Sequence, residues 1–180
     1  MLNHGDVCEV RRHNPGKSRH NSFRDLLARQ IRDQCFSTVS VEYAADAPQA
    51  NPLLRGDLFV TGPAAPDGVS GVVDITFTAP SSSRNTARVS GLARQEDETY
   101  LSWSKRQLRK VTGVRESDKR RKYQGAFLNA FTPVVLTTGG YLSSTSKAWL
   151  KRLDVFTKGK LAVAFDLSVA LIRARASALV

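Results

Sequence analysis

Apolar residues gather in four short runs of this chain, alternating with polar residues in the first of them, and we predict a β-strand at each one. The runs span residues 38–43, 55–60, 72–77 and 131–136, and they are rich in β-branched and aromatic side chains. Glycines and prolines fill the connection between the second and third runs, as expected for a turn. A short turn at 137–140 should end the last strand.

Apolar residues elsewhere recur at helical spacing. Asn21 or Ser22 is a suitable cap for a helix that places Phe23, Leu27 and Ile31 on one face and ends near residue 34. Further helices are predicted at 103–110, 116–129, 143–153 and 160–176, with a loop at 81–85. Strands interspersed with helices indicate an α/β fold.

Size and composition favour one domain. The chain has 180 residues and is 41% hydrophobic, so it can form one well-packed core, which we assign to residues 19–180 after a flexible basic arm at 1–18. No apolar run approaches the ~20 residues that cross a bilayer, and no secretory signal is evident, so no membrane partner is expected. Two cysteines suit a reducing compartment, and we expect an intracellular, nuclear protein.

The charge of the chain predicts an anionic partner. A formal net charge of +11 favours a polyanion, for which DNA is our first expectation and RNA the alternative. Nine lysines and arginines lie between residues 105 and 122, which predicts a phosphate-binding surface, although a solvated basic face is the simpler alternative. The residues that we assign to nucleic-acid binding are Arg19, His20, Lys105, Arg106, Arg109, Lys110, Arg120 and Arg121.

Asp57 and Asp74 are the strongest candidates for chemistry. Each lies within one of two consecutive predicted strands, and Asp74 interrupts the apolar run Val72-Val73-Asp74-Ile75, where a charge is costly unless it is paired. Adjacent strands would bring the two carboxylates together, and a Mg²⁺ or Mn²⁺ ion would relieve their repulsion. We therefore expect them within about 5 Å of each other. A strand start for Asp57 and a structural ion pair for Asp74 are the alternatives.

Several short motifs occur in an order that resembles a known nuclease family. They are Arg19-His20-Asn21, Val41-Glu42, Arg55-Gly56-Asp57, Val73-Asp74-Ile75-Thr76, Lys119-x-x-Lys122-Tyr123, Phe131-x-Pro133-Val134-Val135 and Thr137-Thr138-Gly139-Gly140. Together, over roughly residues 19 to 142, they resemble the restriction-like endonuclease domain of site-specific non-LTR retrotransposons. Those domains belong to the PD-(D/E)XK superfamily, so the resemblance implies a central mixed β-sheet flanked by α-helices.

The resemblance also implies a role for individual residues. Asp57 and Asp74 would be the metal ligands, with Gly56 in place of the usual proline. The commonest superfamily pattern has a lysine where this chain has Thr76. The resemblance therefore implies a lysine on the following helix, Lys122 first and Lys119 second. Glu42 would be a third acidic group.

The function that the resemblance implies is Mg²⁺- or Mn²⁺-dependent hydrolysis of a DNA phosphodiester bond, by which a retrotransposon nicks its target. A reverse transcriptase or a larger polyprotein would then be a partner. Two other hypotheses stay open. One is a basic DNA- or RNA-binding module whose active site has decayed, and the other is a basic structural protein of a ribonucleoprotein or viral particle.

Overall fold

A four-stranded mixed sheet forms the centre of the computed structural model, which describes residues 15–156. Its strands are β1 (Thr38–Ala44), β2 (Arg55–Thr61), β3 (Ser70–Thr78) and β4 (Ala130–Thr137), in the order β1-β2-β3-β4. The first three pair antiparallel, and β4 pairs parallel to β3. All four strands lie where the sequence pattern predicts them, and the α/β class is confirmed.

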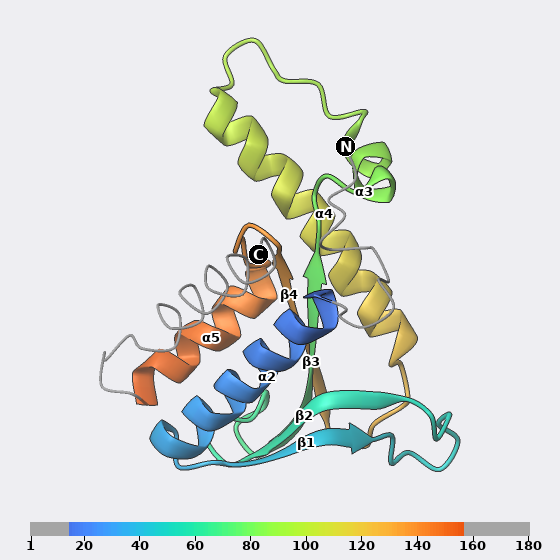
Figure 1. Cartoon of the computed structure of the whole chain (residues 1–180), viewed down its shortest axis with the longest axis vertical. Coiled ribbons are helices and arrows are strands. Elements are labelled where there is room, and N and C mark those ends of the chain that lie inside the picture. The colour runs from blue at the N-terminus through green and yellow to red at the C-terminus, as the bar shows by residue number, and fades with distance from the viewer. Residues whose placement is uncertain (1–14, 157–180) are drawn as a thin grey trace.

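Helices cover both faces of this sheet (Figure 1). α2 (Pro15–Gln34) and α5 (Ser144–Phe156) pack on one face, and α4 (Tyr100–Lys122) lies on the other. The short α3 (Ser83–Val89) precedes α4. The main core lies between the sheet and the helices α2 and α5. It contains Leu27 and Ile31 of α2, Leu58 and Val73 of the sheet, and Leu153 of α5, all of them fully buried.

Several helix boundaries differ from the sequence prediction. α2 begins at Pro15, six residues before the predicted cap, so residues 15–18 of the predicted arm are helical. Proline is common at the first position of a helix, because an N–H at that position has no partner within the helix and the φ of proline is already helical. Residues 81–85 are not only a loop, because α3 begins at Ser83. The predicted helix at 160–176 and residues 1–14 of the arm lie outside the described residues.

α4 is one helix of 23 residues where the sequence predicts two shorter ones. It passes through Gly113 because Val111, Thr112 and Glu116 are buried against the rest of the domain, and this packing outweighs the low helix propensity of glycine. The helix ends at Lys122, not at residue 129, and Gly125 then adopts a φ of +69° that suits a turn. The N-terminal half of α4 and the loop before it extend beyond the sheet (Figure 1).

Candidate active site

Asp57 lies where β2 separates from β3. The paired backbone register of these strands ends at Leu58↔Val73. Beyond that pair the Asp57 carboxylate takes over the role of a backbone acceptor, because its Oδ2 accepts the N–H of Ile75 at 2.6 Å. Its Oδ1 lies 2.9 Å from Nε2 of His20 on α2. The side chain is 17% exposed, so a ligand can still approach it.

Asp74 lies on β3 and is almost completely buried. Its Oδ2 forms an ion pair with Nζ of Lys119 at 2.8 Å, and the hydroxyl of Thr76 donates to the same oxygen at 3.4 Å. Its Oδ1 accepts from the hydroxyl of Tyr123 at 2.9 Å. That hydroxyl is also 2.8 Å from the carbonyl oxygen of Arg55, so it connects the strands just beyond their paired region. These contacts explain how a charge is tolerated inside an apolar strand.

The electrostatics of the site combine burial with nearby charges. Burial raises the pKa of the Asp74 carboxyl above its ordinary value, the Lys119 ammonium opposes this, and the charge of Asp57 adds to it. Burial, followed by the charge of Asp74, raises the pKa of the Tyr123 phenol, so this residue stays a neutral donor. The charge of Asp57 thus acts in the same direction on Asp74 and on Tyr123.

The two candidate lysines occupy different positions. Lys119 contacts Asp74 directly, and its ammonium meets the same carboxylate oxygen as the Thr76 hydroxyl. The ammonium of Lys119 therefore comes from α4 but lies near Thr76. Thr76 is the strand position at which the commonest superfamily pattern has a lysine. Nζ of Lys122 instead lies 4.9 Å from the centroid of the Tyr123 ring and 3.5 Å from its hydroxyl. This geometry ranks Lys119 before Lys122, the reverse of the order expected from sequence.

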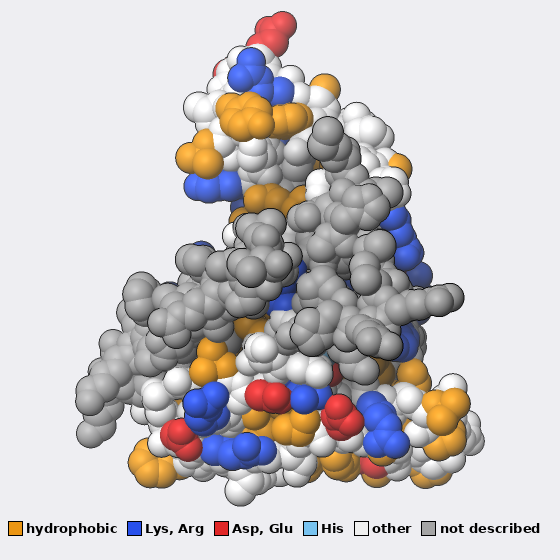
Figure 2. Space-filling model, viewed as in Figure 1, with side chains coloured by type: hydrophobic (Ala, Val, Ile, Leu, Met, Phe, Trp, Pro, Cys, Tyr) orange, Lys and Arg blue, Asp and Glu red, His pale blue; other side chains and the backbone are white. Residues whose placement is uncertain are grey.

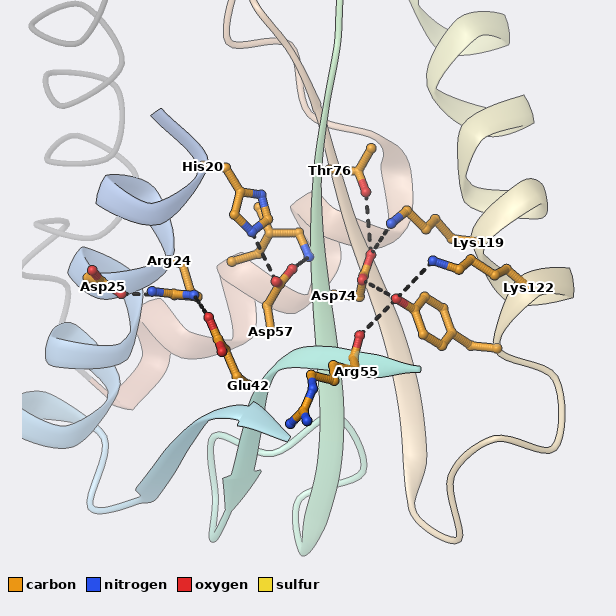
Figure 3. A network of polar contacts seen from close by, with 12 residues as sticks. His20, Arg24, Asp25, Glu42, Arg55, Asp57, Asp74, Thr76, Lys119 and Lys122 are labelled. Atoms are coloured by element: carbon orange, nitrogen blue, oxygen red, sulfur yellow. Dashed lines mark hydrogen bonds and ion pairs between the residues drawn. The ribbon is translucent and has the colours of Figure 1, made fainter. Parts of the chain in front are cut away.

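The two carboxylates point to different helices. Figure 3 shows them on either side of the β3 ribbon, Asp57 toward His20 of α2 and Asp74 toward Lys119 of α4. Among residues 15–156 no three His, Cys, Asp or Glu side chains are grouped to hold a metal ion. Mg²⁺ often uses only one or two carboxylates and keeps several waters. Carboxylates are thus the ligand type that Mg²⁺ or Mn²⁺ uses, but here Asp57 and Asp74 are held by protein donors on opposite sides of β3, so one ion binds both only if these contacts rearrange.

Glu42 does not join this site. It lies on β1 and adopts a φ of +58°. Its neighbours Val41 and Tyr43 pair with the two residues of β2 on either side of Asp57. Its carboxylate binds Nη1 of Arg24 on α2 at 2.9 Å, and its side chain is 63% exposed. The third acid implied by the resemblance thus forms a surface ion pair with an arginine (Figure 3).

The predicted nucleic-acid-binding residues fall into two groups. Five of them are exposed on α4, namely Lys105, Arg109, Lys110, Arg120 and Arg121, and blue side chains line the edge of Figure 2 where the C-terminal half of α4 runs. Arg106 instead binds the carboxylate of Glu98, with its Nε 3.0 Å from Oε1, and the carbonyl of Ala93. Arg19 is buried with its guanidinium 5.9 Å from the centroid of the Phe77 ring. Arg106 and Arg19 are thus already engaged within the protein.

Sequence reasoning missed two contacts of the site. Tyr123 was not predicted to contact Asp74, whereas its hydroxyl binds that carboxylate. Its place in the motif Lys119-x-x-Lys122-Tyr123 was the available signal. His20 was expected to contact phosphate, whereas its ring binds Asp57. No local pattern links residues that are 37 positions apart.

The sequence matches no protein-family model, and comparison with curated proteins gives no significant match. In the described part of the chain, every helix is too short or too polar to cross a membrane.

Proposed function

We propose that this protein is a divalent-metal-dependent endonuclease that hydrolyses phosphodiester bonds of DNA at Asp57 and Asp74. The observation that carries the proposal is the buried carboxylate of Asp74, paired with Lys119 from a strongly basic helix and influenced by the charge of Asp57 on the next strand. A buried acid with a specific charge partner is typical of functional sites. The exposed basic residues of α4 would hold the backbone of the substrate.

Each residue has a distinct role in this proposal. When bound, Mg²⁺ or Mn²⁺ would polarise the scissile phosphate and lower the pKa of an attacking water. Asp57 and Asp74 would hold the ion, and Lys119 would stabilise the negative charge that develops on the phosphate. Tyr123 would keep the Asp74 carboxylate in place through its hydroxyl. Lys122, on the exposed side of Tyr123, would contact a neighbouring phosphate.

The architecture and the motif order support the proposal. A mixed sheet flanked by helices is what the resemblance to the retrotransposon nuclease domain implies. The main departure from the common pattern, Thr76, is compensated in space because the Lys119 ammonium reaches the Asp74 carboxylate at 2.8 Å. We extend the proposal to a nuclear protein that works with a reverse transcriptase or within a larger polyprotein.

A plasmid-nicking assay with Mg²⁺ or Mn²⁺ tests this function. The wild-type protein should convert supercoiled plasmid to the nicked form, and Asp74→Asn or Lys119→Ala should reduce the rate by orders of magnitude. Lys147→Ala is the matched control, because Lys147 is an exposed lysine on α5, which packs on the other face of the sheet. It should change the rate only slightly. An intact plasmid with either metal would overturn the proposal.

A lysine transfer makes the test more specific. Because Thr76 and Lys119 meet the same oxygen of Asp74, adding Thr76→Lys to Lys119→Ala places an ammonium near that oxygen again. The double variant should recover part of the lost rate. No recovery, with a folded double variant, would contradict the role given to Lys119.

A nucleic-acid-binding module without catalysis is the second candidate. It is favoured because every oxygen of the two carboxylates already contacts a donor of the protein: His20, Ile75, Lys119, Thr76 or Tyr123. This candidate predicts binding that falls steeply with salt and no product with either metal. Asp74→Asn would then leave the affinity for DNA unchanged.

A further inference from the structure

A row of aromatic rings lies beside the candidate site, and the proposed chemistry does not use it. Tyr43 stacks on Phe59 with centroids 4.3 Å apart and contacts Phe127 at 6.3 Å. Phe127 in turn stacks on Phe131 at 5.9 Å. We call these four residues the aromatic surface. Each of the four is only partly buried, so the rings are in contact with one another and also with solvent.

The aromatic surface is continuous with the site. Tyr123, which binds Asp74, stacks on Phe127 with centroids 5.6 Å apart. Two segments far apart in sequence support this region. The loop after β1 meets the connection between α4 and β4, because Ala47 donates to the carbonyl of Ala126 at 3.3 Å. The surface therefore begins at the buried acid and extends outward across β2 and β1.

Basic residues flank the aromatic surface. Lys122 lies over the Tyr123 ring, and it ends the run Lys119-Arg120-Arg121-Lys122 that directly precedes the aromatics. Arg55 is exposed on β2 and is paired in the sheet with Ala44, the neighbour of Tyr43. The carboxylate of Asp46 also contacts this surface, since its oxygens accept from the Tyr43 hydroxyl and the Leu128 N–H. Cations near partly exposed aromatic residues suit a polyanion that also presents flat apolar groups.

We infer that the aromatic surface binds the unpaired bases of a single-stranded nucleic acid whose backbone follows the basic residues. In a duplex the faces of the bases are covered by their neighbours, so only the phosphates would be available. In a single strand each base can stack on an aromatic ring while the phosphates contact Lys and Arg. The substrate of the proposed nuclease would then be DNA with an unpaired segment next to the cleaved bond, a link that rests on the proposed function.

The binding itself is tested without cleavage, so that failure of the nuclease and failure of this surface can be distinguished. The full chain is titrated in EDTA against labelled oligo(dT), oligo(rU) and a duplex, each of about 15 nucleotides or base pairs. Anisotropy gives the Kd of each. The Kd of the duplex measures binding through backbone contacts. Tighter binding of oligo(dT) or of oligo(rU) shows whether the aromatic surface prefers DNA or RNA.

Phe127→Leu removes a ring but keeps apolar bulk and charge. It should weaken single-strand binding by about fivefold or more, and duplex binding by less than about twofold. Phe59→Leu should act in the same direction, which guards against a local folding defect in one variant. Arg55→Ala should weaken both forms and lower the salt dependence. Phe156→Leu, on α5 across the sheet, is the matched aromatic control and should change neither Kd.

Two results would overturn the inference. One is a Phe127→Leu protein, folded by its thermal melt, that binds single strands as tightly as the wild type or loses duplex affinity equally. The other is a wild-type protein that self-associates in sedimentation and becomes monomeric in Phe127→Leu, with unchanged affinity for oligonucleotides. The aromatic surface would then be an interface between copies of the chain.

Discussion

Replacing Lys119 by methionine should destabilise the folded protein, because it leaves the buried carboxylate of Asp74 without its cation. Removing one partner of a buried ion pair typically costs about 3–5 kcal/mol. Tyr123 and Thr76 still donate to the carboxylate, and the Lys119 side chain is 18% exposed. We therefore expect a loss of about 2–3 kcal/mol in the free energy of unfolding, a large part of the ~5–15 kcal/mol that a domain has.

The loss should depend on pH in a defined direction. Burial already raises the pKa of Asp74, and without the Lys119 ammonium that opposes this, the pKa rises further. The folded protein then holds a proton more tightly than the unfolded chain. Stability therefore falls as the pH rises from the ordinary aspartate pKa, near ~3.9, through the raised value. Lowering the pH from about 7 to about 5 should recover part of the loss.

Urea denaturation at both pH values, followed by the fluorescence of the buried Trp149, measures this effect. Lys110→Met is the matched control, since Lys110 is exposed on the same helix. Adding Asp74→Asn to Lys119→Met should restore stability, since no buried charge then remains at this pair. A Lys119→Met loss within about 0.5 kcal/mol of the control, with no pH dependence, would refute the reasoning.

Two further predictions concern packing and binding. Gly56→Ala should lower Tm by several degrees, because the new Cβ would lie 2.2 Å from Cγ1 of Val72 and overpacking costs about 1–3 kcal/mol. An unchanged thermal melt would contradict this. Arg106→Ala should speed limited proteolysis between residues 90 and 99, since it breaks the ion pair with Glu98, and should leave DNA affinity nearly unchanged. Arg109→Ala should instead weaken DNA binding and reduce the salt slope by about one. Equal affinities for the two variants would count against the assignment.

The strands could be predicted from sequence because a short run of apolar and β-branched residues is local information. Burial of Val73 and Ile75 on one side of β3 explains why the pattern near Asp74 was recognisable. The helix boundaries depend on tertiary contacts instead. From the sequence alone, Gly113 suggests a break in the helix. The packing of Val111 and Glu116 keeps α4 continuous through this glycine.

The site was predictable only in part for a similar reason. Asp74 stood out because a charge within an apolar strand requires a partner. The choice between Lys119 and Lys122 could not be made, since both belong to one basic run and the sequence does not say how α4 is rotated about its axis. The structure turns Lys119 toward the sheet.

The hydrogen bond from Ile75 to the Asp57 carboxylate makes this amide a natural reporter of the site. A cation that draws the carboxylate away would leave the N–H without its acceptor, and an unsatisfied buried amide costs about 1–3 kcal/mol. This cost would weaken the affinity for the ion when no substrate is bound. Hydrogen–deuterium exchange at this one backbone position should accelerate when the ion enters, which gives a readout of occupancy that requires no turnover.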